Sequence, residues 1–263
     1  MTLPRRKLGN TGLEVSLLGL GTVKIGRNQG VKYPQAFALP TDNEVSLLLD
    51  SAQELGINLL DTAPAYGSSE QRLGKLLRAR ADWLLCTKAG EEFTEGKSRF
   101  DFSAAAIRRS VERSLRNLQT EYLDLVLVHS DGSDLEIIQQ SDCFATLQRM
   151  QEAGAIRAIG MSSKTTAGGL AALPVCDVVM VTCNPRARDD LPVIAAAAAQ
   201  NKGVLIKKAL ASGHLQEQTS GDPVRNNLEF VLGQPGVHSV IVGTLNPEHL
   251  RHNAAAAVAA AQD

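Results

Sequence analysis

The chain has 263 residues with 27 basic and 28 acidic side chains, so its formal net charge is −1. Because the charges balance and the basic clusters at residues 5–7 and 108–109 are short, we expect no binding to nucleic acid or to a membrane surface. A hydrophobic content of 44% is enough to bury a core without disulfide or metal staples. No linker-like composition divides the sequence, so we expect a single domain over residues 1–263.

The start of the chain carries charges without the apolar stretch of a signal peptide, and no segment reaches the ~20 apolar residues of a membrane span. These features predict a cytoplasmic protein. The cysteines Cys86, Cys143, Cys176 and Cys183 are scattered and form no Cys-x-x-Cys pair, so we expect neither disulfides nor a metal site. In the absence of an obvious additional apolar surface, we expect a monomer.

Short apolar runs alternate with longer segments of helical periodicity along the chain. The runs are almost continuously apolar, which is typical of strands covered on both faces in a parallel sheet. We predict eight such strands, at residues 17–21, 57–61, 83–88, 123–129, 158–162, 178–183, 203–208 and 239–243. Helices are predicted at residues 45–55, 70–77, 107–118, 144–153, 165–173, 191–200, 224–233 and 247–261. An α/β (β/α)8 TIM barrel, which takes roughly 250 residues, accounts for this alternation.

The segment before the first strand has a hairpin pattern. Gly9-Asn10-Thr11-Gly12 lies between two short segments that mix polar and apolar residues within residues 7–15. We therefore predict an N-terminal β-hairpin cap at the bottom of the barrel.

Ionisable residues end three consecutive strands. Asp61, Lys88 and His129 each follow at least three apolar residues, and Tyr66 lies in the loop after the strand that ends at Asp61. In such barrels the chemistry lies at the carboxyl ends of the strands. Since an unpaired buried charge is costly, we expect these groups to be mutual partners at one rim.

This set of side chains fits carbonyl reduction. The phenol of Tyr66 has a reference pKa of ~10, and a nearby ammonium, here Lys88, would lower it. Asp61 would hold Lys88, and His129 would donate a hydrogen bond to a carbonyl oxygen and orient the substrate beside the Tyr66 hydroxyl. Tyr66 is therefore the candidate proton donor, opposite a source of hydride.

These residues resemble those of the aldo-keto reductase superfamily, whose catalytic Asp, Tyr, Lys and His correspond to Asp61, Tyr66, Lys88 and His129. The matching segments extend over nearly the whole chain and lie at residues 8–9, 18–22, 61–70, 159–163 and 243–250. The resemblance implies an oxidoreductase that reduces an aldehyde or ketone with NADPH.

A Rossmann site is not predicted, because no Gly-x-Gly-x-x-Gly segment follows a strand and opens a helix. Barrels often bind phosphate in the loops after strands seven and eight, here residues 207–213 and 243–247. The resemblance implies NADP as the cofactor, bound by Gly21, Thr22, Asp61, Ser162, Ser163, Lys208, Leu210, Ser212, Gly243, Thr244, Asn246, His249 and Asn253.

The chain departs from the family pattern at several of these positions. Ser163, Met180 and His249 stand where the family often has Asn, Gln and Arg, which weakens the carboxamide contacts and replaces a permanent cation by a titratable one. The aromatic residue that stacks on nicotinamide in the family falls near Lys207. Strand alternation places one of Lys207 and Lys208 inside the barrel and the other outside.

Two alternatives remain open at this point. One is a barrel that binds the cofactor in a regulatory or redox-sensing role with little catalysis, against which the complete set of four residues argues. The other is a lyase that uses Lys88 as a Schiff-base amine. The physiological carbonyl compound is not specified by the sequence, and residues 24–39 and 91–102 are the candidate lids over the barrel mouth.

Overall fold

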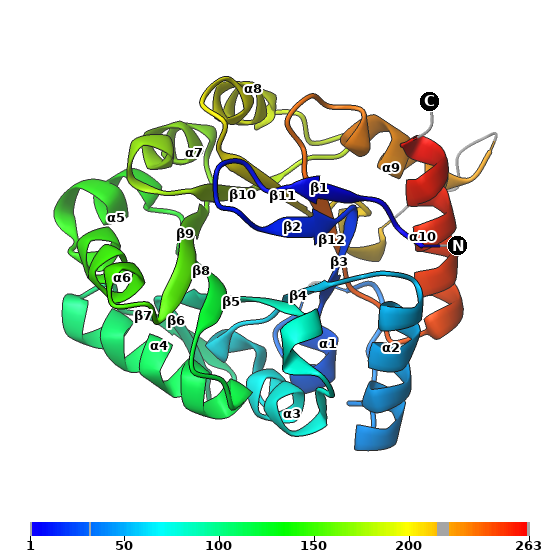
Figure 1. Cartoon of the computed structure of the whole chain (residues 1–263), viewed down its shortest axis with the longest axis horizontal. Helices are drawn as coiled ribbons and strands as arrows, with labels where there is room; N and C mark the ends of the chain where they lie inside the picture. The colour runs from blue at the N-terminus through cyan, green and yellow to red at the C-terminus, as the bar shows by residue number, and fades with distance from the viewer. Residues whose placement is uncertain (1, 32, 215–220, 262–263) are drawn as a thin grey trace.

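The computed structural model describes residues 2–31, 33–214 and 221–261. Eight parallel strands form a closed barrel in chain order, and the last pairs with the first. They are β3 (Leu18–Gly21), β4 (Leu59–Asp61), β5 (Leu84–Ala89), β8 (Leu123–His129), β9 (Ile156–Ser162), β10 (Val178–Thr182), β11 (Gly203–Lys207) and β12 (Ser239–Val242). The predicted (β/α)8 barrel is therefore confirmed, as Figure 1 shows.

The apolar runs form strands because both of their faces are covered. One set of side chains fills the barrel interior and includes Leu59, Cys86, Leu125, Ala158 and Leu205. The alternate set packs outward against the ring of helices as a larger core cluster. The strands consequently read as continuous apolar segments, without the alternation of a half-exposed sheet.

The helices form the outer ring (Figure 1). Their bounds are α2 (Asp42–Glu54), α3 (Ser69–Leu76), α4 (Ala104–Leu118), α6 (Cys143–Glu152), α7 (Thr166–Ala172), α8 (Leu191–Ala199), α9 (Pro223–Leu232) and α10 (Pro247–Ala260). Thr41 begins α2 with a capping box, in which its side chain accepts from Glu44 N while the Glu44 carboxylate accepts from Thr41 N. Each predicted helix is present, with ends that differ by up to three residues.

The N-terminal hairpin closes the base of the barrel. Its strands β1 (Arg5–Lys7) and β2 (Glu14–Ser16) are antiparallel, with Arg6 opposite Val15, and they cross the barrel in Figure 1. Leu8, Leu13 and Val15 are buried and share one cluster with the barrel interior. The predicted cap is confirmed, and it seals the interior with apolar side chains.

Apart from short 3-10 turns, two α-helices and two strands of the described chain were not predicted. They are α1 (Val23–Gly26), α5 (Asp134–Gln140), and a second hairpin of β6 (Glu91–Thr94) and β7 (Lys97–Phe100) within the segment proposed as a lid. Helices α1 and α5 are too short for a periodic pattern to stand out. The hairpin strands are largely polar and exposed, so they lack the apolar runs that identified the barrel strands.

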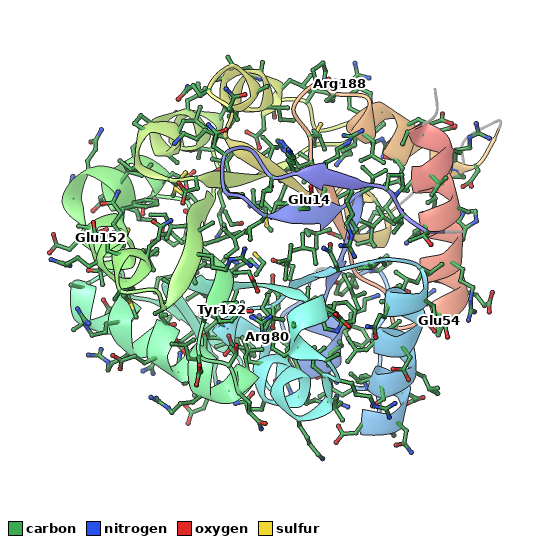
Figure 2. The ribbon with its side chains drawn as sticks, viewed as in Figure 1. Glu14, Glu54, Arg80, Tyr122, Glu152 and Arg188 are labelled. Atoms are coloured by element: carbon green, nitrogen blue, oxygen red, sulfur yellow. The ribbon has the colours of Figure 1, made fainter. Side chains whose placement is uncertain are left out.

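A cluster of charges lies at the base of the barrel wall. Asp124 is buried near the start of β8 and accepts from Arg80 at 2.9 Å, from Arg157 at 2.8 Å and from the Leu85 backbone N–H at 2.9 Å. The Arg80 guanidinium also lies over the ring of Tyr122, and Figure 2 shows the two side chains together. Every charge in this cluster has partners, which is typical of a structural role.

Candidate active site

The mouth of the barrel contains a cavity of about 960 Å³ at the carboxyl ends of the strands. Predicted site residues that line it are Gly21, Thr22, Asp61, Tyr66, Lys88, His129, Ser162, Ser163, Lys208, Leu210, Ser212, Gly243, Thr244, His249 and Asn253. Asn246 is not among the lining residues, because its side chain caps α10 by accepting from Glu248 N at 2.8 Å. The strand-end residues therefore do converge on one rim.

Asp61 and Lys88 form a buried ion pair across neighbouring strands. Lys88 Nζ donates to Asp61 Oδ1 at 2.5 Å and to the Thr62 carbonyl at 2.9 Å. Burial alone would lower the pKa of Lys88, but Asp61 and the other acidic groups around it raise the pKa above its ordinary value. The amine therefore stays protonated, which argues against Lys88 as a Schiff-base nucleophile.

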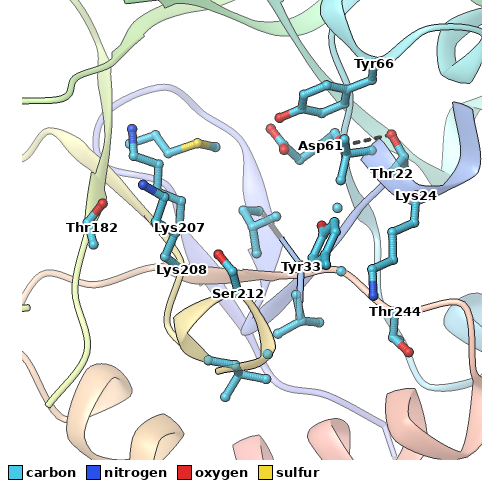
Figure 3. A pocket seen from close by; sticks show the side chains of 18 of the residues that line it. Thr22, Lys24, Tyr33, Asp61, Tyr66, Thr182, Lys207, Lys208, Ser212 and Thr244 are labelled. Atoms are coloured by element: carbon cyan, nitrogen blue, oxygen red, sulfur yellow. Dashed lines mark hydrogen bonds between the residues drawn. The ribbon is translucent and has the colours of Figure 1, made fainter. Parts of the chain in front are cut away.

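Tyr66 lies on the short 3-10 turn Pro64–Tyr66 that follows β4. Lys88 Nζ is 4.8 Å from the centroid of its ring. Gly26 allows α1 to press against this turn, because a Cβ there would lie 2.3 Å from the Tyr66 carbonyl and 2.2 Å from Ser69 N. Close backbone packing thus fixes the position of the phenol at the edge of the cavity, as Figure 3 shows.

The net pKa of Tyr66 differs from the sequence-based expectation. Burial raises it above the ordinary value of a phenol, and Lys88 opposes this effect only in part. The expected lowering by Lys88 is present, but it is smaller than the effect of burial. Tyr66 is therefore a fully protonated phenol with a cation beside it.

His129 is the last residue of β8, and its ring contacts that of Tyr66. The two rings meet edge to face with their centroids 6.2 Å apart. Nδ1 of His129 lies 2.9 Å from Oε2 of Glu91, the first residue of the β6–β7 hairpin. The pKa of His129 is lowered, because burial outweighs the opposing effect of Glu91. Glu91 was not identified from the sequence as a site residue.

Lys207 is the side chain that turns inward at the end of β11. Its Nζ donates to Ser162 Oγ at 2.9 Å and to the Ser163 carbonyl at 2.5 Å, and Figure 3 shows the side chain at the cavity. Burial lowers the pKa of Lys207 to about 7, with further lowering by Lys208 and Lys88. Lys208 also lines the cavity but is exposed to solvent. The alternation of side chains along a strand could not decide which of the two lysines faces the barrel interior. Lys207 was not among the predicted site residues.

An aromatic side chain from the proposed lid also covers the cavity. Tyr33 packs edge to face against Phe37, and the ammonium of Lys24 lies 4.0 Å from the Tyr33 ring centroid. Tyr33 and Lys24 both line the cavity (Figure 3). This part of the segment 24–39 therefore forms a wall of the site.

The charges around the cavity suit an anionic ligand. Five lysines line it, namely Lys24, Lys88, Lys164, Lys207 and Lys208, together with His129, His249 and His252. Among the lining residues that the structure describes, Asp61 is the single carboxylate, and it is paired with Lys88. The buried Ser163 Oγ has no hydrogen-bond partner within the described part of the chain, so it can bind a ligand group.

Other expectations concern metals, thiols and membranes. All four cysteines are free and buried, as predicted. Among residues 2–31, 33–214 and 221–261, no group of three or more His, Cys, Asp or Glu side chains could hold a metal ion. Within the same ranges, every helix is too short or too polar to cross a membrane.

Comparison with known proteins decides the family. The profile of the aldo/keto reductase family matches residues 17–229. The chain belongs to the aldo/keto reductase family. An L-galactose dehydrogenase from Arabidopsis thaliana is 33% identical to this aldo/keto reductase. The match covers 81% of this chain and 67% of the L-galactose dehydrogenase. A D-threo-aldose 1-dehydrogenase from a Pseudomonas species is 26% identical, over 92% and 89% of the two chains.

Solved structures agree with this assignment. A candidate aldo-keto reductase from Pseudomonas aeruginosa superposes with a TM-score of 0.90 and 56% identity, over 99% of this chain and 97% of the other. The holo form of an aldo-keto reductase from Bacillus halodurans gives a TM-score of 0.79 and 25% identity, over 97% of this chain and 90% of the other. The aldo/keto reductase described here is thus an oxidoreductase of carbonyl compounds that uses a nicotinamide cofactor.

Proposed function

We propose that this aldo/keto reductase reduces an aldehyde or ketone to an alcohol with NADPH, and that Tyr66 donates the proton. The observation that carries the proposal is the placement of the Tyr66 phenol beside the buried Asp61–Lys88 pair, at the edge of a cavity lined by cations. A cytoplasmic location and a monomeric state remain predictions.

The cavity residues fit a dinucleotide with an additional phosphate. When bound, NADPH supplies the hydride for the carbonyl carbon. Ser162 and Ser163 would hold the nicotinamide carboxamide, and Leu210 and Ser212 would lie along the pyrophosphate. Thr244, His249 and Asn253 would contact the adenosine and its 2′-phosphate, and the exposed Lys208 adds a cation for the phosphates.

The roles of the catalytic residues follow from their electrostatics. Because burial raises the pKa of Tyr66, the phenol keeps its proton until a stronger base forms beside it. An alkoxide at the carbonyl oxygen would be such a base, and it would take the proton from the Tyr66 hydroxyl. Lys88 then stabilises the phenolate, and Asp61 keeps Lys88 charged and in place.

The names of two relatives suggest where to look for the substrate. Both are dehydrogenases of sugars or sugar-like compounds. Hydroxylated aldehydes are therefore the first compounds to screen, in the reduction direction and in the reverse. The regulatory alternative has no observation in its favour, since all four catalytic side chains are present at the cavity.

The test is Tyr66→Phe, which removes the transferable proton and keeps the ring. We expect carbonyl reduction to fall by about 10²- to 10⁴-fold while the affinity for NADPH is retained. Tyr33→Phe is the matched control, because Tyr33 lines the same cavity but its ring contacts Phe37 and the Lys24 ammonium, and it should retain most of the activity. Undiminished turnover in Tyr66→Phe would overturn the proposed mechanism.

A further inference from the structure

The β6–β7 hairpin brings a carboxylate to the back of the active site. It follows β5 directly, after a turn at Gly90 with a φ of +106°. The guanidinium of Arg27 lies 3.4 Å from the ring centroid of Phe93 on β6, and the same guanidinium donates to the Ala65 carbonyl at 3.0 Å. The hairpin is thereby anchored to the turn that carries Tyr66.

Glu91 uses both of its oxygens. Oε2 lies 2.9 Å from Nδ1 of His129, and Oε1 accepts from Ser98 Oγ at 2.6 Å. The Glu91 side chain is 11% exposed and that of His129 is 17% exposed. Burial alone would raise the pKa of Glu91, but contact with His129, the hydrogen bond from Ser98 and the charge of Arg27 lower it to about 2. Glu91 is therefore an anion at every pH at which the enzyme would be assayed.

An ionised carboxylate can only accept hydrogen bonds. The nitrogen that faces it, Nδ1 of His129, must therefore carry the hydrogen. Nδ1 is also the buried nitrogen, and its 2.9 Å contact with Oε2 is an ion-pair contact outside hydrogen-bond geometry. Nε2 is not among the enclosed atoms, and the ring lines the cavity. In neutral His129 the cavity-facing Nε2 is then unprotonated and is a hydrogen-bond acceptor.

We infer that Glu91 is a positioning residue that fixes the Nδ1–H tautomer of His129 and so gives the imidazole different roles in its two protonation states. Neutral His129 accepts a hydrogen bond from a hydroxyl at Nε2, which suits a bound alcohol. Protonated His129 donates from Nε2 to a carbonyl oxygen, and the charge of Glu91 stabilises that imidazolium. This inference about the two directions of reaction rests on the proposed carbonyl reductase function, whereas the tautomer does not.

The charges around His129 oppose one another. Glu91 on the hairpin favours the imidazolium, while burial, Lys88 on β5 and Lys207 on β11 disfavour it. Asp61 on β4 is paired with Lys88, and Tyr66 is uncharged. Glu91 is therefore the main charge that favours the imidazolium, and its removal should lower the pKa of His129 further.

The tautomer can be read directly by NMR on the full-length protein without cofactor or substrate. Long-range ¹H–¹⁵N spectra of ¹⁵N-labelled protein would show the five histidines, and His129→Asn would assign the signal of His129. At alkaline pH we expect Nδ1 to have the shift of a protonated ring nitrogen and Nε2 that of an unprotonated one. A protonated Nε2 in the wild-type protein would overturn the inference.

Two substitutions separate the charge of Glu91 from its contact with Nδ1 of His129. Glu91→Gln retains an acceptor oxygen, so the tautomer should persist while the pKa of His129 falls by about 1 unit or more. Glu91→Ala removes the acceptor as well, so neutral His129 should no longer be held in the Nδ1–H tautomer. Glu92→Gln is the matched control, because Glu92 is the next residue on the hairpin but pairs with Arg113, and it should change neither property.

Activity gives the second readout. Because the pKa of His129 falls in Glu91→Gln, the imidazolium is lost at lower pH, and the reduction rate should decline at correspondingly lower pH. Oxidation of the alcohol, which uses neutral His129, should extend to lower pH. If kcat/KM falls equally in both directions at every pH, Glu91 has only a structural role. If Tyr66→Phe retains turnover while the NMR result holds, the proposed function fails and the tautomer assignment stands.

Discussion

Two buried aspartates at opposite ends of the barrel wall show how position separates stability from chemistry. Asp124 at the base is enclosed by Arg80, Arg157 and a backbone N–H. Asp61 at the mouth has Lys88 as its partner, and the pair borders a cavity of about 960 Å³ beside Tyr66. Both aspartates are paired, but only the pair at the mouth leaves room for a reacting molecule.

The contrast extends to the surroundings of each pair. At the base, the N-terminal hairpin fills the interior with Leu8, Leu13 and Val15. At the mouth, lysines, histidines and hydroxyl groups line the opening. Substitutions at the base should therefore change stability with little effect on the chemistry, whereas those at the mouth should change the chemistry.

Lys88→Met should have the largest effect, because it alters both properties. Removal of the cation leaves Asp61 buried and unpaired, which should cost about 3–5 kcal/mol in the free energy of unfolding. Loss of the charge that stabilises the phenolate should lower kcat by about 10²-fold or more. Denaturant unfolding and steady-state kinetics would measure the two effects, and full activity in this variant would remove Lys88 from the mechanism.

The double variant Asp61→Leu/Lys88→Met would separate the two effects. Replacement of both partners by apolar side chains removes the unpaired charge, so most of the lost stability should return. Activity should remain as low as in Lys88→Met. Recovery of activity together with stability would show that the single variant was inactive only because it was poorly folded.

Leu8→Ala tests the apolar base. Leu8 is fully buried in the cluster that joins the hairpin to the barrel interior, so its truncation should cost about 2–5 kcal/mol of stability. Below the unfolding transition, kcat should equal that of the wild type. A large loss of kcat in folded Leu8→Ala would mean that the hairpin influences the mouth.

Asp124→Asn tests the charged cluster at the base. The variant weakens hydrogen bonds to two arginines, and we expect a loss of about 1.5–3 kcal/mol in the free energy of unfolding. Cofactor binding and kcat should be unchanged. Asp124→Asn would then lose stability alone, whereas Lys88→Met would lose both stability and activity. This difference would separate the roles of the two aspartates most clearly.

His249→Arg should produce the smallest change. His249 lines the rim of the cavity and is exposed, so a permanent positive charge there should strengthen NADPH binding only about two- to fivefold. NADH, which has no 2′-phosphate, should gain much less. Titrations with the two cofactors would measure this difference, and an equal gain for both would place the 2′-phosphate elsewhere.

The sequence predicted that three of the four candidate catalytic residues would meet, because they occupy positions that periodicity defines, and it placed Tyr66 in the loop after one of these strands. Asp61, Lys88 and His129 end apolar strands, and such ends meet at one rim of a barrel. The pKa of Tyr66 was harder to predict, since the sequence shows the nearby lysine but not the depth of burial.

The missed residues depend on contacts that spacing does not encode. Glu91 reaches His129 only because the polar β6–β7 hairpin follows β5 and is anchored through Arg27 to the turn that carries Tyr66. Lys207 and its neighbour Lys208 are adjacent lysines, and the register of β11 decides which of them turns inward. Tyr33 lies in an irregular segment whose path is set by tertiary packing. A carboxylate soon after a strand-end lysine was the one available signal for Glu91.

The central claim is that the mouth of the barrel, and not its base, holds the cofactor. A fluorescence titration of the wild-type protein with NADPH and with NADH tests this claim most directly. Nicotinamide emission is the better signal, because Trp83 is buried at the base where β5 begins. We predict tighter binding of NADPH than of NADH, unchanged in Asp124→Asn and weakened when Ser212 and Thr244 at the mouth are replaced by bulky residues. Failure of the wild-type protein to bind either cofactor would contradict the account.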